Sequence, residues 1–224
     1  MKTTYLKKKL GILGGGQLGK MLMNVTRKWS IETYILDPNP DCPASNCCDF
    51  FFKGDFNNYQ DVYNFGKKVD IITIEIEHVN VEALYKLEKE GVDVYPSPSN
   101  IQLIQNKGVQ KDFFKKNKIP TSDYKRFDNK KSLSKYIFKT KSKYPFIWKS
   151  ETMGYDGKGV KLVQSFSDLD GVNENSCVME EFVDIKHELS VLVARNKSGK
   201  SKSFPVLEME FNQKSNQVEY VILP

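Results

Sequence analysis

Residues 154–159 (GYDGKG) form the stretch of this chain whose composition points most directly to chemistry. Glycines at 154, 157 and 159 leave backbone N–H groups exposed, and these can surround phosphate oxygens while Lys158 neutralises their charge. A plain surface hairpin is the simpler alternative, but such a hairpin has no structural need for Tyr155 and Asp156 within the loop. No Gly-Lys-Ser or Gly-Lys-Thr precedes a helix here, so this is not a Walker loop. The pattern favours a lid over phosphate groups.

Two lysines and a run of acids could complete such a site. Lys107 and Lys149 precede the glycine-rich loop and are expected at the ends of structural elements. Two ammonium groups commonly neutralise the charge of a polyphosphate. The run 178–183 (VMEEFV) is apolar apart from two acids, and Glu188 follows it. Carboxylates at a strand end can accept ribose hydroxyls, and the backbone between them can contact an adenine edge. Surface lysines and solvated glutamates on an edge strand are the alternatives.

Residues 14–19 (GGGQLG) satisfy the pattern G-x-G-x-x-G between an expected strand and an expected helix. Asp37 follows about twenty residues later, where a dinucleotide site places the acid that binds ribose. NAD binding is therefore one candidate, and a tight strand-to-helix turn in a doubly wound sheet is the other. Glu75 and Glu77 close a further strand, at the carboxyl end where parallel sheets bind ligands.

The first hundred residues alternate between expected strands and helices. Leu18, Met21, Leu22 and Val25 recur at the spacing of one helix face, which we expect to be buried. Further helices are expected at 58–65, closed by Gly66, and at 81–89, closed by Gly91. The strands are expected at 9–13, 33–36, 69–76 and 92–95. Helices between strands predict an α/β domain with a doubly wound parallel sheet.

The pattern changes after residue 99. A helix over 100–116, with Ser99 as its N-cap, leads into a strand-rich region, which indicates a second, α+β domain. Residues 120–127 are expected to be extended, 133–138 helical, and 196–199 (NKSG) a hairpin turn. Strands are expected at 146–149, 160–163, 178–181, 188–195, 203–210 and 218–222.

Composition and charge exclude several classes of protein. The 224 residues include 39% hydrophobic residues, which is enough for a core and excludes a disordered chain. The net charge is 34 − 28 = +6, but the lysine-rich stretch 107–143 carries no zinc-finger, RRM or helix-turn-helix pattern, so no nucleic-acid partner is expected. Cys42, Cys47, Cys48 and Cys177 lack metal-site spacing and are expected to be reduced thiols.

No stretch approaches the roughly 18 apolar residues that span a bilayer, and residues 1–16 lack the features of a secretory signal. We therefore expect a cytoplasmic protein that does not associate with membranes. Residues 221–224 (VILP) come directly after an expected strand with no helix or polar tail behind them. From this we expect the chain to be the first part of a longer protein.

Taken in order, these motifs resemble the ATP-grasp superfamily and, within it, the N5-carboxyaminoimidazole ribonucleotide synthetase family. The matching stretches are GILGGGQLGKML, TIEIEHV, YPSPSNIQLIQNK, WKSETMGYDGKGV and VMEEFVDIKHELSVLVAR. The resemblance implies a Rossmann-like pre-ATP-grasp domain over 1–105. It further implies the N-terminal part of an incomplete ATP-grasp domain over 106–224, with a lid subdomain over about 120–182.

The resemblance also implies roles for individual residues. Glu188 matches the acid that binds ribose, and Lys158 stands where arginine is common, which keeps the charge but loses the bidentate fork. The residues implied in ATP binding are Lys107, Lys149, Gly154, Tyr155, Asp156, Gly157, Lys158, Gly159, Val160, Glu180, Glu181, Phe182, Val183 and Glu188. The residues implied in contacting aminoimidazole ribonucleotide are Gln17, Leu18, Glu77, Tyr155, Asp156 and Lys158.

The implied reaction joins bicarbonate to aminoimidazole ribonucleotide at the expense of ATP, with Mg²⁺ on the phosphates and carboxyphosphate as the intermediate. The family's metal-binding acids and its bicarbonate-binding residues are expected beyond Pro224, so no metal or catalytic residue is expected in this chain. A homodimer is expected for a full-length protein. A non-catalytic ATP-binding module and an NAD-dependent oxidoreductase remain the alternatives.

Overall fold

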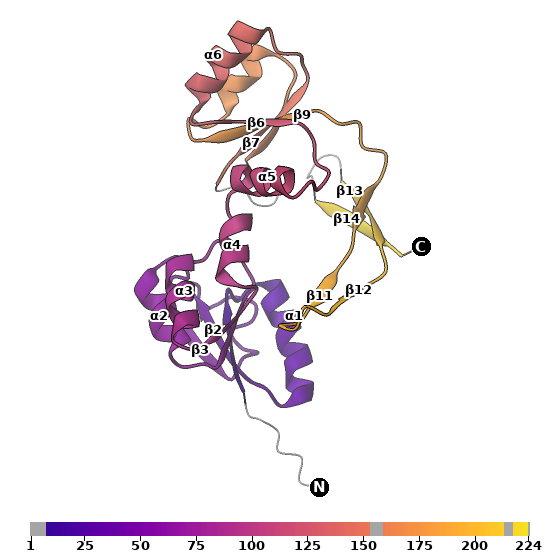
Figure 1. Ribbon diagram of the computed structural model, residues 1–224. Helices are drawn as coiled ribbons and strands as arrows, with labels where there is room; N and C mark the ends of the chain where they lie inside the picture. Colours follow the sequence, from indigo (N-terminus) through magenta and orange to yellow (C-terminus); the bar gives the residue numbers. More distant parts are fainter. Residues whose placement is uncertain (1–7, 153–158, 213–216, 224) are drawn as a thin grey trace. The chain divides into compact units, whose positions relative to one another are not determined.

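The computed structural model describes residues 8–152, 159–212 and 217–223. The chain divides into two compact units, Met1–Val109 and Gln110–Pro224 (Figure 1), and each is described by itself. Among the described helices, none combines the length and the apolar character that a membrane span requires.

The first unit is built on a five-stranded parallel sheet in the order β3-β2-β1-β4-β5. Its strands are β1 (Lys9–Leu13), β2 (Glu32–Asp37), β3 (Phe50–Lys53), β4 (Ile71–Ile74) and β5 (Asp93–Tyr95). The order reverses between β1 and β4, which is the switch point of a doubly wound sheet. The predicted α/β class is confirmed, while β3 was not predicted because its aromatic run, FFFK, shows no alternation.

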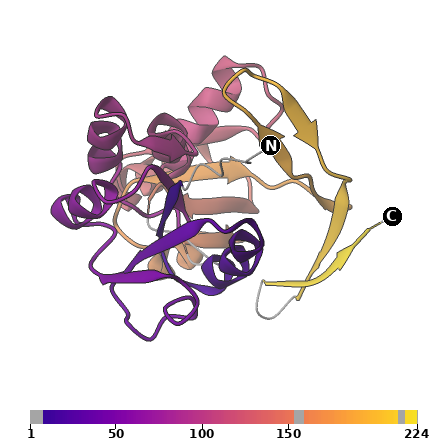
Figure 2. The ribbon, with the colours of Figure 1, turned by 90° about the horizontal axis from the view of Figure 1, so that it is seen from below.

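Helices cover both faces of this sheet (Figures 1 and 2). Ile12 packs with Met23 on one face, and the adjacent Leu13 packs with Leu84 and Leu87 on the other, because successive strand residues point in opposite directions. The covering elements are α1 (Gln17–Thr26), the 3₁₀ turn η1 (Arg27–Trp29), α2 (Tyr59–Gly66), α3 (Val81–Lys89) and α4 (Pro98–Ile104).

Helix α1 buries a different face from the one that we predicted. Gly19, Met23 and Thr26 are buried, while Leu18 and Met21 are 64% and 55% exposed. The close approach of Gly19 to the carbonyl of Gly14 lets the glycine side of α1 lie against the sheet. The role predicted for Gly66 is also wrong: it lies within α2, where a Cβ would collide with Leu87, so packing rather than a left-handed turn requires glycine.

The single helix predicted over 100–116 is two helices, α4 (Pro98–Ile104) and α5 (Lys107–Lys116). Ser97, not Ser99, is the N-cap of α4 and accepts a hydrogen bond from the backbone of Asn100. The helix breaks because the Asn106 side chain accepts the N–H of Val109 at 2.9 Å, which starts a new helix.

The second unit contains a four-stranded antiparallel sheet in the order β6-β9-β7-β8. Its strands are β6 (Tyr124–Phe127), β7 (Phe146–Ser150), β8 (Val160–Val163) and β9 (Cys177–Glu181), all close to their predicted positions. Helix α6 (Lys130–Thr140) and the 3₁₀ turn η2 (Phe166–Gly171) cover one face, where Leu133, Ile137 and Leu169 pack against Phe146 and Trp148.

The remaining strands are β10 (Glu188–Ser190), β11 (Val193–Arg195), β12 (Ser201–Ser203), β13 (Leu207–Phe211) and β14 (Val218–Ile222). The predicted strands 188–195 and 203–210 are each divided, because the chain passes from the sheet β10-β13-β14 into the hairpin β11-β12 and back. Pro205, which has no N–H to donate, lies in the second break. The predicted turn at 196–199 is confirmed.

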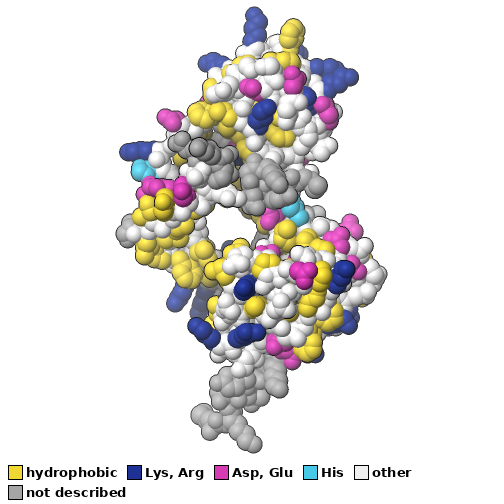
Figure 3. Space-filling model, turned by 180° about the vertical axis from the view of Figure 1, so that it is seen from behind, with side chains coloured by type: hydrophobic (Ala, Val, Ile, Leu, Met, Phe, Trp, Pro, Cys, Tyr) yellow, Lys and Arg dark blue, Asp and Glu magenta, His cyan; other side chains and the backbone are white. Residues whose placement is uncertain are grey.

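No described residue from position 181 onward is buried, and hydrophobic side chains of these strands lie at the surface (Figure 3).

Candidate functional site

Lys149 and Glu180 lie together on the face of the four-stranded sheet that α6 does not cover. In β7 the buried residues are Phe146, Trp148 and Ser150, so Lys149 points to the opposite face. Its Nζ lies 3.1 Å from Oε2 of Glu180 on the neighbouring strand β9. Two residues that were singled out from the sequence thus form an ion pair.

A second lysine, Lys111 of α5, joins this pair and was missed from the sequence. Its Nζ lies 2.9 Å from the same Glu180 oxygen and donates to the hydroxyls of Thr121 at 2.7 Å and Ser122 at 2.8 Å. Ser122 in turn donates to Glu180 Oε2 at 3.0 Å. The only available signal was that Lys111 follows Lys107 by one helical turn, which places both on one side of α5.

The two oxygens of Glu180 have contrasting environments. Burial opposes ionisation of this carboxyl, but the hydrogen bond from Lys111 and the charge of Lys149 outweigh it and hold the pKa of Glu180 below its ordinary value. Oε1 is buried and has no hydrogen-bond partner within the described part of the chain. The carboxylate therefore retains one acceptor that a ligand could use.

Arg126 of β6 connects α5 to the end of β7. Its guanidinium binds both oxygens of Glu151, at 2.6 and 3.0 Å, and donates to Asp112 at 2.6 Å. Tyr124 also donates to Asp112, at 2.7 Å, and burial followed by this bond raises the pKa of Tyr124 to about 12. The sequence did not reveal this network, because its members lie on three separate elements.

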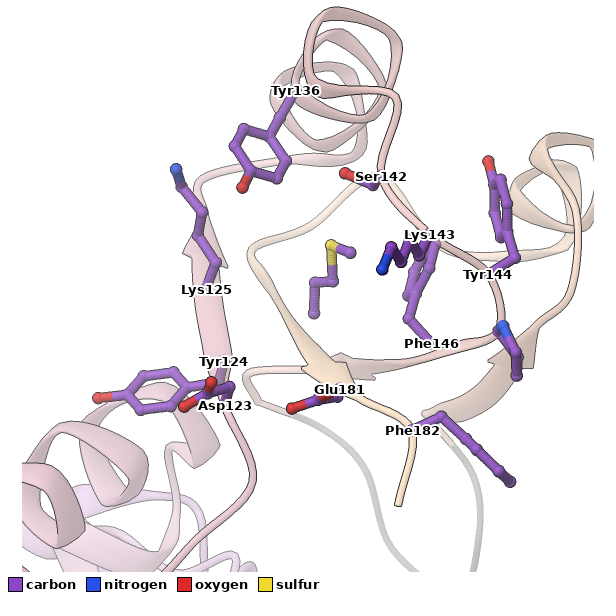
Figure 4. Close-up of a pocket in the computed structure, with 12 residues that line it drawn as sticks. Asp123, Tyr124, Lys125, Tyr136, Ser142, Lys143, Tyr144, Phe146, Glu181 and Phe182 are labelled. Carbon is purple, nitrogen blue, oxygen red and sulfur yellow. The ribbon is translucent and has the colours of Figure 1, made fainter. Parts of the chain in front are cut away.

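Glu181, although adjacent to Glu180, faces the opposite side of the sheet. It lines a pocket of about 590 Å³ on the α6 side, together with Lys125, Tyr136, Lys143, Phe146 and Met179 (Figure 4). We call this the α6-side pocket. The Glu181 N–H donates to the carbonyl of Asp123 at 2.8 Å, and the following Phe182 and Val183 are exposed. The resemblance implies ATP contacts for both Glu180 and Glu181, whereas their carboxylates point to opposite faces of the sheet.

The predicted phosphate loop falls largely outside the described residues, and this includes Gly154, Tyr155, Asp156, Gly157 and Lys158. Its base is described. Ser150 N–H donates to the carbonyl of Gly159 at 2.8 Å, and Gly159 has φ +78°, which favours glycine. Val160 begins β8 directly opposite Lys149, so the two ends of the loop are closed beside that lysine.

Two further residues that the resemblance implies in ATP binding begin elements of their own. Lys107 is the first residue of α5, and Glu188 is the exposed first residue of β10, opposite Met209.

In the first unit, the residues predicted to contact the substrate lie just beyond the carboxyl ends of β1 and β4. Gln17 and Leu18 begin α1 and are exposed. Glu77 follows β4, and its carbonyl accepts from Gln105 Nε2 at 2.7 Å. Gln105 also donates to the carbonyl of Val79 at 2.9 Å, which fixes the segment that carries Glu77.

The glycine turn of the first unit is filled by protein groups. A Cβ at Gly15 would collide with Cys42, and one at Gly16 would collide with the carboxylate of Glu75. Asp37 accepts the N–H of Gly15 at 2.7 Å and that of Asn39 at 2.8 Å. These two carboxylates beside the turn would repel a pyrophosphate, which argues against the dinucleotide interpretation.

Within the described residues there is no group of three or more His, Cys, Asp or Glu side chains that could hold a metal. The four cysteines are free thiols, and burial raises the pKa of Cys177 to about 11.

Comparisons with known proteins show what this chain resembles in sequence and in fold. The family of ribonucleotide synthetase preATP-grasp domains matches residues 7–105, and the family of ATP-grasp domains matches residues 112–224. Phosphoribosylaminoimidazole carboxylase of Candida glabrata is 39% identical over 210 residues, which are 89% of this chain and 36% of that protein. N5-carboxyaminoimidazole ribonucleotide synthase of Staphylococcus epidermidis is 32% identical over 216 residues, 93% of this chain and 55% of that protein.

Among solved structures, carboxyaminoimidazole ribonucleotide synthase from Aspergillus clavatus complexed with ATP has a TM-score of 0.87 at 31% identity. The match covers 97% of this chain and 57% of that one, so the chain spans little more than half of that relative. The Aspergillus clavatus enzyme in complex with ADP and 5-aminoimidazole ribonucleotide has a TM-score of 0.80 at 28% identity, over 94% of this chain and 56% of that one. The chain belongs to the ATP-grasp family, with a ribonucleotide synthetase preATP-grasp domain ahead of its ATP-grasp domain.

Proposed function

We propose that this chain is the nucleotide-binding part of an N5-carboxyaminoimidazole ribonucleotide synthetase. The observation that carries the proposal is the convergence of Lys111 and Lys149 on the buried carboxylate of Glu180, on the open face of the sheet. The named activities of the relatives, and the ATP, ADP and 5-aminoimidazole ribonucleotide bound in their structures, support it.

In this proposal ATP lies on the open face of the four-stranded sheet. The ammonium of Lys149, whose side chain is 29% exposed, moves from Glu180 to a phosphate oxygen, while Lys111, at 12%, remains with Glu180. Ile147 shares the face of Lys149 and offers an apolar surface to the adenine. Glu180 Oε1 is a free acceptor for the exocyclic amine of the base.

The remaining ATP contacts in the proposal come from the backbone beyond Glu181, from Lys107, and from Glu188 on the ribose. Residues 154–159 close over the phosphates.

The reaction that we propose has two steps. A bicarbonate oxygen attacks the γ-phosphorus, and the bond to the β,γ-bridging oxygen breaks to give carboxyphosphate and ADP. The amine of aminoimidazole ribonucleotide then attacks the carboxyphosphate carbon, loses a proton and expels phosphate, which gives N5-carboxyaminoimidazole ribonucleotide. Carboxyphosphate hydrolyses readily, so water has to be excluded by the loop.

In the proposal, Gln17, Leu18 and Glu77 contact the ribonucleotide together with Tyr155, Asp156 and Lys158. Mg²⁺ accompanies ATP, but the described residues do not include a cluster that fits the ion. A homodimer in the cytoplasm, and a domain boundary at 105, are further parts of the proposal.

Isothermal titration of the chain with ATP tests the site. We expect Lys149→Ala to raise the Kd for ATP at least tenfold, because one phosphate-neutralising charge is lost, while Lys139→Ala on the exposed side of α6 leaves the Kd unchanged. Equal affinity of the two variants would overturn the assignment of Lys149. Phosphate release on addition of bicarbonate and aminoimidazole ribonucleotide tests the reaction, and ATP binding without such release would leave only a nucleotide-binding module.

A further inference from the structure

The α6-side pocket is a separate feature from the proposed ATP site. Residues alternate between the two faces along β9, so Met179 lines the pocket while Glu180 points away from it. Across the sheet, Lys125 is paired with Met179, and Phe146 with Glu181, and all four of these residues line the pocket. Lys149 and Glu180 do not. A ligand in the pocket would therefore lie on the other side of the sheet from ATP.

Flat, polarisable side chains form the walls of the pocket. Tyr144 stacks on Phe146 with ring centroids 5.5 Å apart, and Tyr136 stands across from them on α6 (Figure 4). Met179 also lines the pocket and offers a thioether, which makes favourable contacts with aromatic rings. The volume of about 590 Å³ is within the range of small-molecule sites. These walls suit a planar heterocycle.

The charged groups of the pocket are separated by sign. Lys125 and Lys143 lie toward α6, and the Nζ of Lys125 is 3.9 Å from the centre of the Tyr136 ring (Figure 4). Asp123 and Glu181 lie at the opposite end, where β6 begins and β9 ends. The ion pairs found among the described residues involve none of these four side chains. Two cations and two anions are thus available to one ligand.

From this arrangement we propose that the α6-side pocket binds a nucleoside monophosphate whose base carries an exocyclic amine. The base stacks against the aromatic walls over Met179. Its amine donates to the carboxylates of Asp123 and Glu181, and its phosphate is bound by Lys125 and Lys143. A base without a phosphate leaves the two lysines unpaired, and phosphate without a base gains nothing from the aromatic walls.

AMP is the probe for this site, used with a non-hydrolysable ATP analogue held at saturation so that the proposed ATP site is occupied. We expect one equivalent of AMP still to bind by isothermal titration. The double variant Lys125→Glu, Lys143→Glu is expected to raise the Kd at least tenfold, while the charge reversal Lys139→Glu on the exposed side of α6 leaves it unchanged. Adenosine and inorganic phosphate are each expected to bind at least tenfold more weakly than AMP.

A second readout locates the ligand. With ¹³C-methyl-labelled methionine, AMP is expected to shift the Met179 resonance by ring current while leaving Met23 and Met209 in place, and Met179→Leu identifies the signal. Loss of AMP binding on addition of the ATP analogue would overturn the proposal, as would an unmoved Met179 resonance or equal effects of the lysine variants. Binding of the ATP analogue is measured beforehand in a separate titration, so failure of this proposal is distinguishable from failure of the proposed function.

Discussion

The two main sheets of this protein bury their faces in different ways. In the parallel sheet of the first unit, β2 is buried continuously from Thr33 to Asp37 because helices cover both sides. In the antiparallel sheet of the second unit, β7 alternates between buried and half-buried residues because α6 covers one side only. A sheet covered on both faces can present functional groups only beyond its strand ends, as with Glu77. A sheet with one open face can present them along a strand, as with Lys149.

The largest effect is expected from a cavity in the fully covered sheet. Leu87→Ala removes a side chain that is 0% exposed and packed against Gly66, and should lower the free energy of unfolding by about 2–5 kcal/mol. Ile147→Ala, on the open face of the other sheet, should lower the free energy of unfolding by clearly less, because that side chain is already half-exposed. Urea unfolding of both variants measures the difference, and equal losses would contradict the contrast between the two sheets.

The next effect concerns the network that fastens α5 to the open-faced sheet. Arg126→Ala leaves the Glu151 carboxylate, which is 6% exposed, without its bidentate partner. We expect the free energy of unfolding to fall by about 2 kcal/mol. Arg126→Lys keeps the positive charge but loses the bidentate geometry of the guanidinium. Its free energy of unfolding should therefore lie between those of the wild type and Arg126→Ala. A lysine variant as unstable as the alanine variant would show that charge alone contributes nothing here.

A smaller, pH-dependent effect is expected at Glu180. Its pKa is lower in the folded chain than in the unfolded one, so its ionised form stabilises the fold above the unfolded pKa of about 4.3. That contribution is lost as the pH falls through the folded pKa. Glu180→Gln should therefore lower the free energy of unfolding by about 1 kcal/mol at pH 7. The difference between this variant and the wild type should become smaller as the pH falls. Unfolding measured from pH 7 downward checks this, and a constant difference would refute it.

The smallest effect is expected on the surface of the first unit, where Glu90 binds Lys67 and Lys86, each at 3.0 Å. The hydrogen bonds from Lys86 and then Lys67 lower the pKa of Glu90 to about 2. Its stabilisation is present above about pH 4.5 and lost between that value and about pH 2. We expect Glu90→Gln to lower Tm slightly at low salt and hardly at all at high salt. A difference in Tm between Glu90→Gln and the wild type that does not change with salt would show that Glu90 stabilises the fold through packing and not through its charge.

Most elements of the fold could be predicted because their signals are local. The apolar run in KLGIL, the Gly91 turn after α3 and the Asn-Lys-Ser-Gly hairpin each depend on neighbouring residues, and each lies where it was expected. The wrongly predicted boundaries are explained by single residues that interrupt an otherwise continuous pattern. Asn106 starts a helix where the apolar spacing alone continued one, and Pro205 interrupts a strand whose composition is otherwise uniform.

The candidate site could be predicted only in part. Lys149 and Glu180 stood out because they flank glycines and apolar runs, and the structure joins them across 31 residues of sequence. Lys111 and Arg126 did not stand out, because a lysine or arginine in a lysine-rich stretch looks the same whether it is solvated or paired. Ser122 reaches Glu180 across 58 residues, a separation that no local pattern encodes.

The amino-acid sequence alone determined where strands and helices form, since backbone propensity, caps and the period of apolar residues act over a few positions. Only the tertiary structure decided which face of α1 is buried and which of Glu180 and Glu181 points to the open face of the sheet. It also decided that two lysines from separate elements share a single carboxylate oxygen. These outcomes depend on which elements pack together, and packing is a property of the whole chain rather than of any segment.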